Sequence, residues 1–593
     1  MYKHSKSLIN ELFSFNSKSH QSNIKRTIMI SFFAVLVGII SGLGAVAFRY
    51  MIAFFHNLFF LKTISFQYDS AANFISSYGW TVIFVPVVGM IIVNFLTENF
   101  APEARGHGVP EVMSAVYENG GKIRPIVSII KSFASAISIG SGGSVGREGP
   151  IVQIGASFGS SLGQIFKLKP RETIILVAAG VAGGIAATFN APIGGVTFAI
   201  ELILPEFSIL TFLPLIISST VATYIASLFL GLAPAFVIPT YHFVSPYEFI
   251  FYIALGFLSA FVAILYIKTL YGMEDFFEKI KINPYLKGII GSLILGIIGY
   301  VLYRFFGHYY IFGVGYSFIT DTLLNKNTTL IVVFVLIFLK IIANSLTLGA
   351  GGSGGIFAPS LFMGIGSGAV IGIIVNNLFP GIVAPVSAYA LVGMAAVVAG
   401  TTSASLTAIV MTFEMTRNYE IMLPLMLAVG ISHFTTRLLY KENIYTKKLV
   451  RRGIHVQSDK LVSIFKLTEV KEVINPNIIY VTKDMLVNEA LVLMTVNDLA
   501  VLPVIDGNEV LGVVKYTDLF NFYDTDADKP ILDLIIDLDI IISPKNDTVE
   551  AMEKMGNNKV GLLVVKDNDK ILGITTRNKI IKKYFEKRKR LLD

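Results

Sequence analysis

Four long apolar runs constrain this chain more than any other feature of its sequence. They span Thr27 to Phe48, Trp80 to Leu96, Ile174 to Ile203 and Leu330 to Leu348. A helix crosses the hydrocarbon core of a bilayer in about 20 apolar residues, and each run is near that length or longer. Hydrophobic residues make up 54% of the 593 residues and charged residues only 15%, which is not the composition of a soluble protein. The sequence therefore predicts a polytopic α-helical membrane protein.

The first 26 residues are polar and basic, with five lysines and arginines and no apolar core of the secretory kind. We interpret residues 1–26 as a retained tail. Its excess of positive charge beside the first span predicts a cytoplasmic N-terminus. The net charge of +8 favours the lipid bilayer as a partner, and no concentrated basic face predicts nucleic-acid binding. The absence of cysteine excludes disulfides and thiolate metal sites.

The apolar character ends near Tyr445, and the chain then becomes mixed and charged. This change predicts a transmembrane domain over residues 27–450, a linker over residues 451–470 and a soluble C-terminal part. The C-terminus is expected on the same side of the membrane as the N-terminus, in the cytoplasm.

Two glycine-rich interruptions of the apolar sequence resemble each other. "GSGGSVGREGP" at residues 140–150 aligns with "GAGGSGGIFAP" at residues 349–359, and a segment ending at Glu201 aligns with one ending at Glu414. The alignment predicts a two-fold internal repeat, with halves over about 27–225 and 245–450. Broken segments at matching positions of two halves indicate a binding site near the middle of the membrane. The alternative is that the repeat is only a trace of gene duplication and forms no binding site.

The segment "GREGP" at residues 146–150 favours an anion as the ligand. A glycine-rich loop that runs into a helix presents free N–H groups and the positive end of the helix dipole. Glu148 places a carboxylate where such an anion would bind, so it is predicted to compete with the anion. Alternatively, Glu148 only caps a helix and pairs with Arg147.

Four motifs in order, "GHGVPEV" at 106–112, "GREGP", "GGIFAP" at 354–359 and the lone Tyr445, resemble the signature set of the CLC chloride channels and transporters. The resemblance covers residues from about 30 to 445. It implies the CLC fold with inverted halves, a homodimer with one anion pathway per subunit, and chloride and protons as the transported ions. It also implies Glu148 as the gate and a set of anion-binding residues, namely His107, Gly146, Arg147, Gly149, Ile356, Phe357 and Tyr445.

Two positions depart from the family pattern. His107 stands where most members have serine, and it is either an N–H donor to the anion or a neutral histidine satisfied by the backbone. Leu202 stands where proton-coupled members have the inner glutamate, and leucine cannot carry a proton. Glu201 is expected to be a structural carboxylate hydrogen-bonded among helix ends, and a substitute proton relay is the alternative. Lys131, a lone cation in an apolar run, is either a structural residue with satisfied hydrogen bonds or, as we favour, a cation whose positive field lowers the cost of a buried anion.

The C-terminal part contains a second repeat, because residues 490–519 align with residues 551–580. Each copy is predicted to form an apolar helix, a strand, a tight turn, a second strand and a helix. This pattern resembles a tandem pair of CBS domains, over 471–528 and 529–593, which form a cytoplasmic α/β pair. The resemblance implies an adenine nucleotide at Thr517, Asp518 and Thr576, although Lys579 replaces an expected aspartate. Dimerisation alone is the alternative role.

The leading hypothesis is chloride transport, gated by a protonatable glutamate and regulated by the tail. Whether it is proton exchange or channel conduction stays open because of Leu202. A nucleotide sensor with vestigial transport and a transporter of another anion are the alternatives. No nucleophile–histidine arrangement, HExxH motif, phosphate-binding loop or metal-ligand cluster predicts an enzyme, and no cofactor is required.

Overall fold

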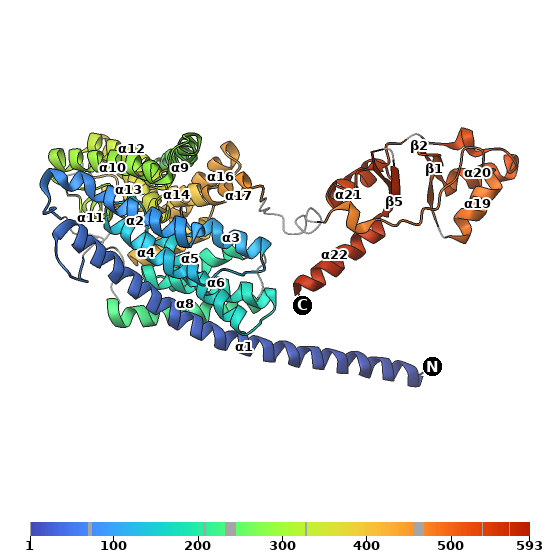
Figure 1. Ribbon diagram of the computed structural model, residues 1–593, viewed down its shortest axis with the longest axis horizontal. Coiled ribbons are helices and arrows are strands. Elements are labelled where there is room, and N and C mark those ends of the chain that lie inside the picture. Colours follow the sequence, from blue (N-terminus) through green and yellow to red (C-terminus); the bar gives the residue numbers. More distant parts are fainter. Residues whose placement is uncertain are drawn as a thin grey trace. The chain divides into compact units, whose positions relative to one another are not determined.

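The computed structural model describes residues 2–592 except 69–73, 205–208, 232–235, 237–244, 327–328, 455–467, 498, 537 and 569. Contacts divide the chain into two compact units, residues 1–455 and 456–593. Nine of the described helices are long and apolar enough to cross a membrane, and all of them lie in the first unit. The described strands all lie in the second unit (Figure 1). Most of the predicted linker, 451–470, falls outside the described residues.

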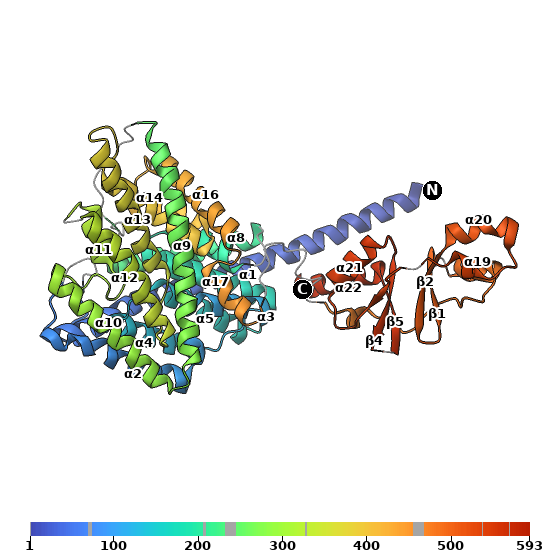
Figure 2. The same cartoon turned by 90° about the horizontal axis from the view of Figure 1, so that it is seen from above.

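The first unit contains two successive series of helices. The first series is α1 (Tyr2–His56), α2 (Val85–Phe100), α3 (Val109–Glu118), α4 (Ile126–Gly140), α5 (Glu148–Ile165), α6 (Pro170–Phe189), α7 (Pro192–Phe198) and α8 (Ile209–Leu230). The second is α9 (Glu248–Lys279), α10 (Pro284–Phe306), α11 (Tyr316–Leu323), α12 (Leu330–Gly349), α13 (Phe357–Leu378), α14 (Val386–Thr402), α15 (Ser405–Thr416) and α16 (Met422–Leu439), followed by α17 (Ile444–Arg451). The α5 and α13 helices therefore begin at the two glycine-rich breaks. In Figure 2 the long helix α9 runs beside α12, α13 and α16.

The two series use the same close helix crossing. Helix α5 packs on α6 through Gly155 and Gly180, and a Cβ on either glycine would overlap the carbonyl oxygen of the other. Helix α13 packs on α14 through Gly364 and Gly393 in the same way. Lipid tails are as apolar as these helices, so membrane helices associate through close packing of small residues rather than by the hydrophobic effect. Matching glycine contacts thus fix matching geometries in the two halves.

The second unit contains two copies of one α/β motif. Its elements are η5 (Val470–Val473), α19 (Val487–Val496), β1 (Val501–Asp506), β2 (Glu509–Lys515), α20 (Tyr516–Asp526), η6 (Ile531–Leu534), β3 (Ile541–Ile542), α21 (Thr548–Asn557), β4 (Leu562–Asp567), β5 (Lys570–Thr576) and α22 (Arg577–Leu592). Strands β1 and β2 pair antiparallel, as do β4 and β5, and β3 adds in parallel to β4. The order helix, strand, turn, strand, helix agrees with the sequence prediction in both copies.

The two copies exchange short segments. Val470 and Val473 lie in the apolar core of the second copy, and the Val470 N–H donates to the Asn546 carbonyl. Ile531, from the start of the second copy, lies in the core of the first, where its N–H donates to the Met485 carbonyl. Each copy therefore contributes a segment to the core of the other.

Two glutamates at matching positions join the halves of the membrane unit. The Glu201 carboxylate accepts from the backbone N–H groups of Leu406 (3.0 Å) and Thr407 (2.7 Å) at the start of α15. The Glu414 carboxylate accepts from the N–H groups of Ile193 (3.0 Å) and Gly194 (2.6 Å) at the start of α7. The first N–H groups of a helix have no partner within it, and a carboxylate there also favours the helix dipole. Glu201 is thus a structural carboxylate among helix ends, as the sequence indicates.

We expect Glu414→Ala to destabilise the membrane unit, because it leaves two N–H groups of α7 without their acceptor. Hydrogen bonds to a charged group are each worth about 1.5–3 kcal/mol, so the apparent melting temperature in detergent should fall clearly. Glu118→Ala, at an exposed carboxylate that accepts from the Ser114 hydroxyl, is the control and should leave the melting temperature nearly unchanged. Equal melting temperatures for both variants would contradict the capping role.

Candidate functional site

The two glycine-rich loops meet in the middle of the membrane unit. The Gly146 N–H donates to the Gly355 carbonyl over 2.7 Å, and the Gly355 N–H donates back to the Gly146 carbonyl over 2.6 Å. Helix α5 starts two residues after the first loop contact and α13 two residues after the second. The positive ends of two helix dipoles therefore converge on one small region, which is an arrangement that attracts an anion.

The Glu148 carboxylate occupies this region. Its Oε2 accepts from the Ala358 N–H in the first turn of α13 over 3.2 Å, and its Oε1 accepts from the Tyr316 hydroxyl over 3.5 Å. The side chain is buried, as are Ile356 and Phe357 at the start of α13. A carboxylate thus sits at the helix terminus where the sequence predicts that an anion and Glu148 compete.

Gly149 allows a third segment to approach. A Cβ on Gly149 would overlap the carbonyl oxygen of His107 and lie 3.0 Å from the Gly355 Cα. The loop of His107 also pairs with the second glycine-rich loop, because the Gly106 N–H donates to the Gly352 carbonyl over 3.0 Å. The backbones of all three segments are consequently in contact at one point.

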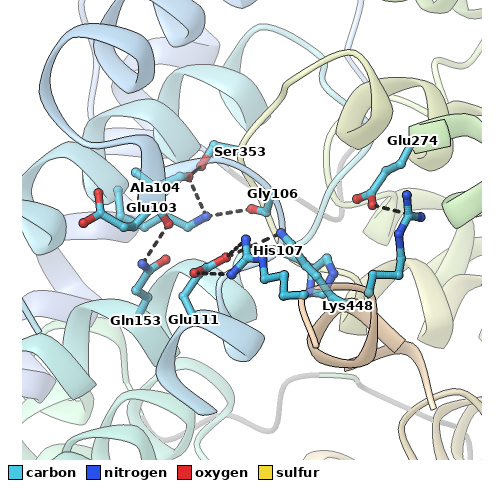
Figure 3. Close-up of polar contacts among 12 residues, drawn as sticks. Glu103, Ala104, Gly106, His107, Glu111, Gln153, Glu274, Ser353 and Lys448 are labelled. Carbon is cyan, nitrogen blue, oxygen red and sulfur yellow. Dashed lines mark hydrogen bonds and ion pairs between the residues drawn. The ribbon is translucent and has the colours of Figure 1, made fainter. Parts of the chain in front are cut away.

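A buried lysine holds the loop of His107 in place. The Lys131 ammonium donates to the Ala104 carbonyl over 2.9 Å and to the Gly106 carbonyl over 2.7 Å, and the Ser353 hydroxyl donates to the same Ala104 carbonyl (Figure 3). The hydrogen bonds of Lys131 therefore go to backbone carbonyls. Lys131 thus has the structural role of fixing the loop that carries His107.

His107 lies at the end of this loop, fully buried, just before α3. Its Nε2 is 3.4 Å from the Tyr271 hydroxyl, its ring centroid is 5.9 Å from that of Tyr445, and its Nδ1 has no hydrogen-bond partner among the described residues. The Tyr271 hydroxyl donates in turn to the Ile444 carbonyl, next to Tyr445. The structure thus brings His107 and Tyr445 together, as the motifs predict.

Positively charged side chains also lie around the carboxylate of Glu111, in the helix that follows His107. Glu111 pairs with Arg452 at 2.8 Å and with Lys448 at 3.6 Å, and Figure 3 shows it close to Lys448 and His107. Burial alone would raise the pKa of Glu111, but the hydrogen bond from Arg452 and the charge of Lys448 outweigh burial and hold that pKa below its ordinary value. The ion pairs attach the end of α17 to α3.

Sequence reasoning missed two residues of the site, Tyr316 and Lys340. The offset that aligns Gly140 with Gly349 also aligns His107 with Tyr316 and Lys131 with Lys340. Lys340 is fully buried and donates to the carbonyls of Ile311 (3.2 Å) and Gly313 (3.0 Å), as Lys131 does in the first half. Extending the repeat backwards from the glycine-rich loops would have found both residues.

Arg147 contacts aromatic rings rather than the carboxylate next to it. Its guanidinium lies 5.2 Å from the centroid of the Tyr316 ring and 5.9 Å from that of Phe189, and it donates to the Thr188 carbonyl over 3.4 Å. Tyr316 therefore contacts both Arg147 and Glu148. Among the described residues, no direct contact joins the Arg147 guanidinium to the Glu148 carboxylate. The alternative in which these two side chains simply pair is therefore not supported.

The candidate nucleotide residues of the second unit lie where a strand meets a helix. Thr517 and Asp518 begin α20, and the Thr517 hydroxyl donates to the Asp518 carboxylate over 3.2 Å. Thr576 ends β5, and its hydroxyl accepts from the Lys579 N–H over 3.3 Å. The Lys579 ammonium donates to the Ile474 carbonyl over 2.8 Å, so this lysine has a structural contact.

Comparison with known proteins agrees with this geometry. The family model of the voltage gated chloride channel matches residues 88–437, more than half of the chain. The chain belongs to this family. The model of the CBS domain matches twice, over residues 470–524 and 535–586, so the second unit is a pair of CBS domains.

Relatives of this chloride channel family cover most of the membrane unit. The H(+)/Cl(-) exchange transporter ClcA of Vibrio vulnificus is 30% identical over 441 residues, which are 73% of this chain and 91% of the relative. The protein of the same name from Vibrio parahaemolyticus is 32% identical over 376 residues, which are 62% of this chain and 78% of the relative.

Solved structures show the same fold. A slow cyanobacterial Cl-/H+ antiporter superposes with a TM-score of 0.63 and 25% identity, over 72% of this chain and 98% of the antiporter. A eukaryotic CLC transporter superposes with a TM-score of 0.61 and 19% identity, over 93% of this chain and 98% of that protein. The chain therefore has the CLC fold of a multi-pass integral membrane protein.

We expect Gly149→Ala to disrupt the site, because the added methyl group would overlap the His107 carbonyl oxygen. Overpacking of this kind usually costs about 1–3 kcal/mol and here displaces backbone, so both the apparent melting temperature and anion flux should fall. Gly272→Ala, also within a helix, is the matched control, because a Cβ at Gly272 meets nothing within 4 Å. Normal flux through the Gly149→Ala variant would show that the three backbones do not need this close contact.

Proposed function

We propose that this protein exchanges chloride for protons across a membrane, with Glu148 as the gate of the anion pathway. One observation carries the proposal, namely that the Glu148 carboxylate accepts a backbone N–H at the start of α13. When ionised, the carboxylate takes the place of an anion at the helix terminus. When protonated, it loses most of its attraction to those N–H groups and leaves the place to chloride.

The anion-binding residues on this proposal come from both halves. Tyr445 offers its hydroxyl and α13 its first backbone N–H groups at Ile356 and Phe357, and the ring of His107 lies beside that of Tyr445. The protein acts as a homodimer with one pathway per subunit and with both termini in the cytoplasm. The basic N-terminal tail and the fold shared with CLC transporters support this arrangement.

Proton transfer on the inner side needs a route without the usual glutamate. Leu202 is apolar and buried, and the adjacent Glu201 is held at the start of α15. We propose that protons reach Glu148 from the cytoplasm along water rather than through a second carboxylate. The exchange named for the ClcA relatives and for the cyanobacterial antiporter supports coupling.

The decisive measurement follows protons in liposomes that hold the protein and a chloride gradient. We expect uphill proton movement with the native protein, faster chloride flux at acidic external pH, and loss of both effects in Glu148→Gln, where a neutral amide cannot titrate. Glu414→Gln, at the helix-capping carboxylate, is the control that should keep coupling. Chloride flux without proton movement would make the protein a channel, and coupling that persists in Glu148→Gln would reject the gating role.

We further propose that an adenine nucleotide binds the CBS pair through Thr517 and Asp518. The full-length protein should bind ATP or AMP, and Asp518→Ala should weaken binding at least about tenfold, as expected when a hydrogen bond to a charged group is lost. Asp506→Ala is the control, because it also removes an aspartate of the first copy, but one that pairs with Lys483 at 2.7 Å and is not a candidate nucleotide residue. If the native protein binds neither nucleotide, the CBS pair has only a structural role.

A further inference from the structure

A small cavity lies beside the gate and is separate from the helix terminus that Glu148 occupies. It encloses about 50 Å³ between the end of α1, the loop before α5 and residues 309–317. Each ordered water needs roughly 10–15 Å³ of such space, so the cavity has room for a dehydrated halide with one or two waters. Arg147 and Tyr316, which contact each other and lie next to the gate, form part of its wall.

Three polar atoms in the wall are buried and have no hydrogen-bond partner among the described residues. They are both ring nitrogens of His56 and the Nε of Arg147. The His56 side chain is only 4% exposed, and its ring is fixed by stacking on Tyr68 at 3.8 Å and by the edge of Phe74 at 4.5 Å. A buried polar group left unpaired costs about 1–3 kcal/mol, so these atoms point to an occupant that pairs with them.

The charge of the wall selects the kind of occupant. Arg147 lines the cavity, and none of the described lining residues carries a carboxylate. The buried Lys340 lies behind the wall, where its ammonium donates to the carbonyl of Gly313, itself a lining residue. Cations are repelled by such a wall, and an apolar molecule would leave the unpaired nitrogens unsatisfied.

We propose that this cavity is a second binding site for a small inorganic anion such as chloride, held by His56 and Arg147 beside the gate. A neutral imidazole supplies one N–H donor, and the Arg147 Nε supplies a charge-assisted one. The inference rests on the proposed function and orientation, which place the end of α1 at the outer surface. An anion bound here occupies the outer entrance of the anion pathway, and its negative charge repels the ionised Glu148 carboxylate.

Bromide replaces chloride in the primary test because its anomalous scattering identifies it. Crystals of the full-length native protein in bromide should show one peak in contact with His56 and Arg147, and a separate peak between Tyr445 and the start of α13. His56→Phe keeps the ring for stacking on Tyr68 and removes both nitrogens, so it should lose the first peak and keep the second. His308→Phe is the matched control, because His308 also has a buried unpartnered nitrogen but does not line the cavity.

Flux measurements in liposomes give a second readout. We expect His56→Phe to raise the external chloride concentration for half-maximal flux about tenfold, the effect of losing one hydrogen bond to an ion, and to leave the internal chloride dependence unchanged. Bromide near Tyr445 with only water in the cavity overturns the inference and leaves the proposed function intact. Bromide in neither place overturns both, and a cavity peak that survives in His56→Phe rejects His56 as its ligand.

Discussion

The pair of backbone hydrogen bonds between Gly146 and Gly355 is the contact on which the rest of the membrane unit depends. It holds the two broken segments together, so α5 and α13 start from one point and direct their positive ends into it. Side chains would prevent it, because a Cβ on Gly146 would overlap the Glu148 carboxylate and one on Gly355 would lie 2.7 Å from the Gly149 nitrogen. Broken helices are tolerated in a membrane only where their backbone groups find partners, and here each loop supplies them to the other.

The sequence predicted those parts of the site that consist of glycine-rich loops or of isolated charged residues. The glycine-rich loops located the starts of α5 and α13, and Glu148 located the carboxylate that lies at the start of α13. Tyr316 was missed because one tyrosine among 25 carries no local signal, and only the alignment of the two halves or its contact with Glu148 distinguishes it. Lys131 was given both a structural and an electrostatic interpretation, but the two carbonyls to which it donates could not be named, because they depend on the path of a distant loop.

In the CBS pair, too, the sequence predicted the local elements but not the contacts between distant segments. The repeated pattern of helix, strand and turn predicted the elements of each copy, because both the apolar periodicity and the turn residues are local. The exchange of Val470 and Ile531 between the two cores was not predicted, since it joins segments that are distant in sequence. Sequence patterns specify which face of an element is apolar, but not which neighbour covers that face.

The reciprocal capping by Glu201 and Glu414 limits what one half of the membrane unit can do alone. Each half carries one such carboxylate and one helix start that needs it, but within a half the two do not meet, because Glu201 serves α15 and Glu414 serves α7. If one half existed alone, its carboxylate and its helix start would both find partners only in a second copy with the opposite orientation in the membrane. The contact between the halves therefore has the form of an antiparallel dimer interface that is contained within one chain.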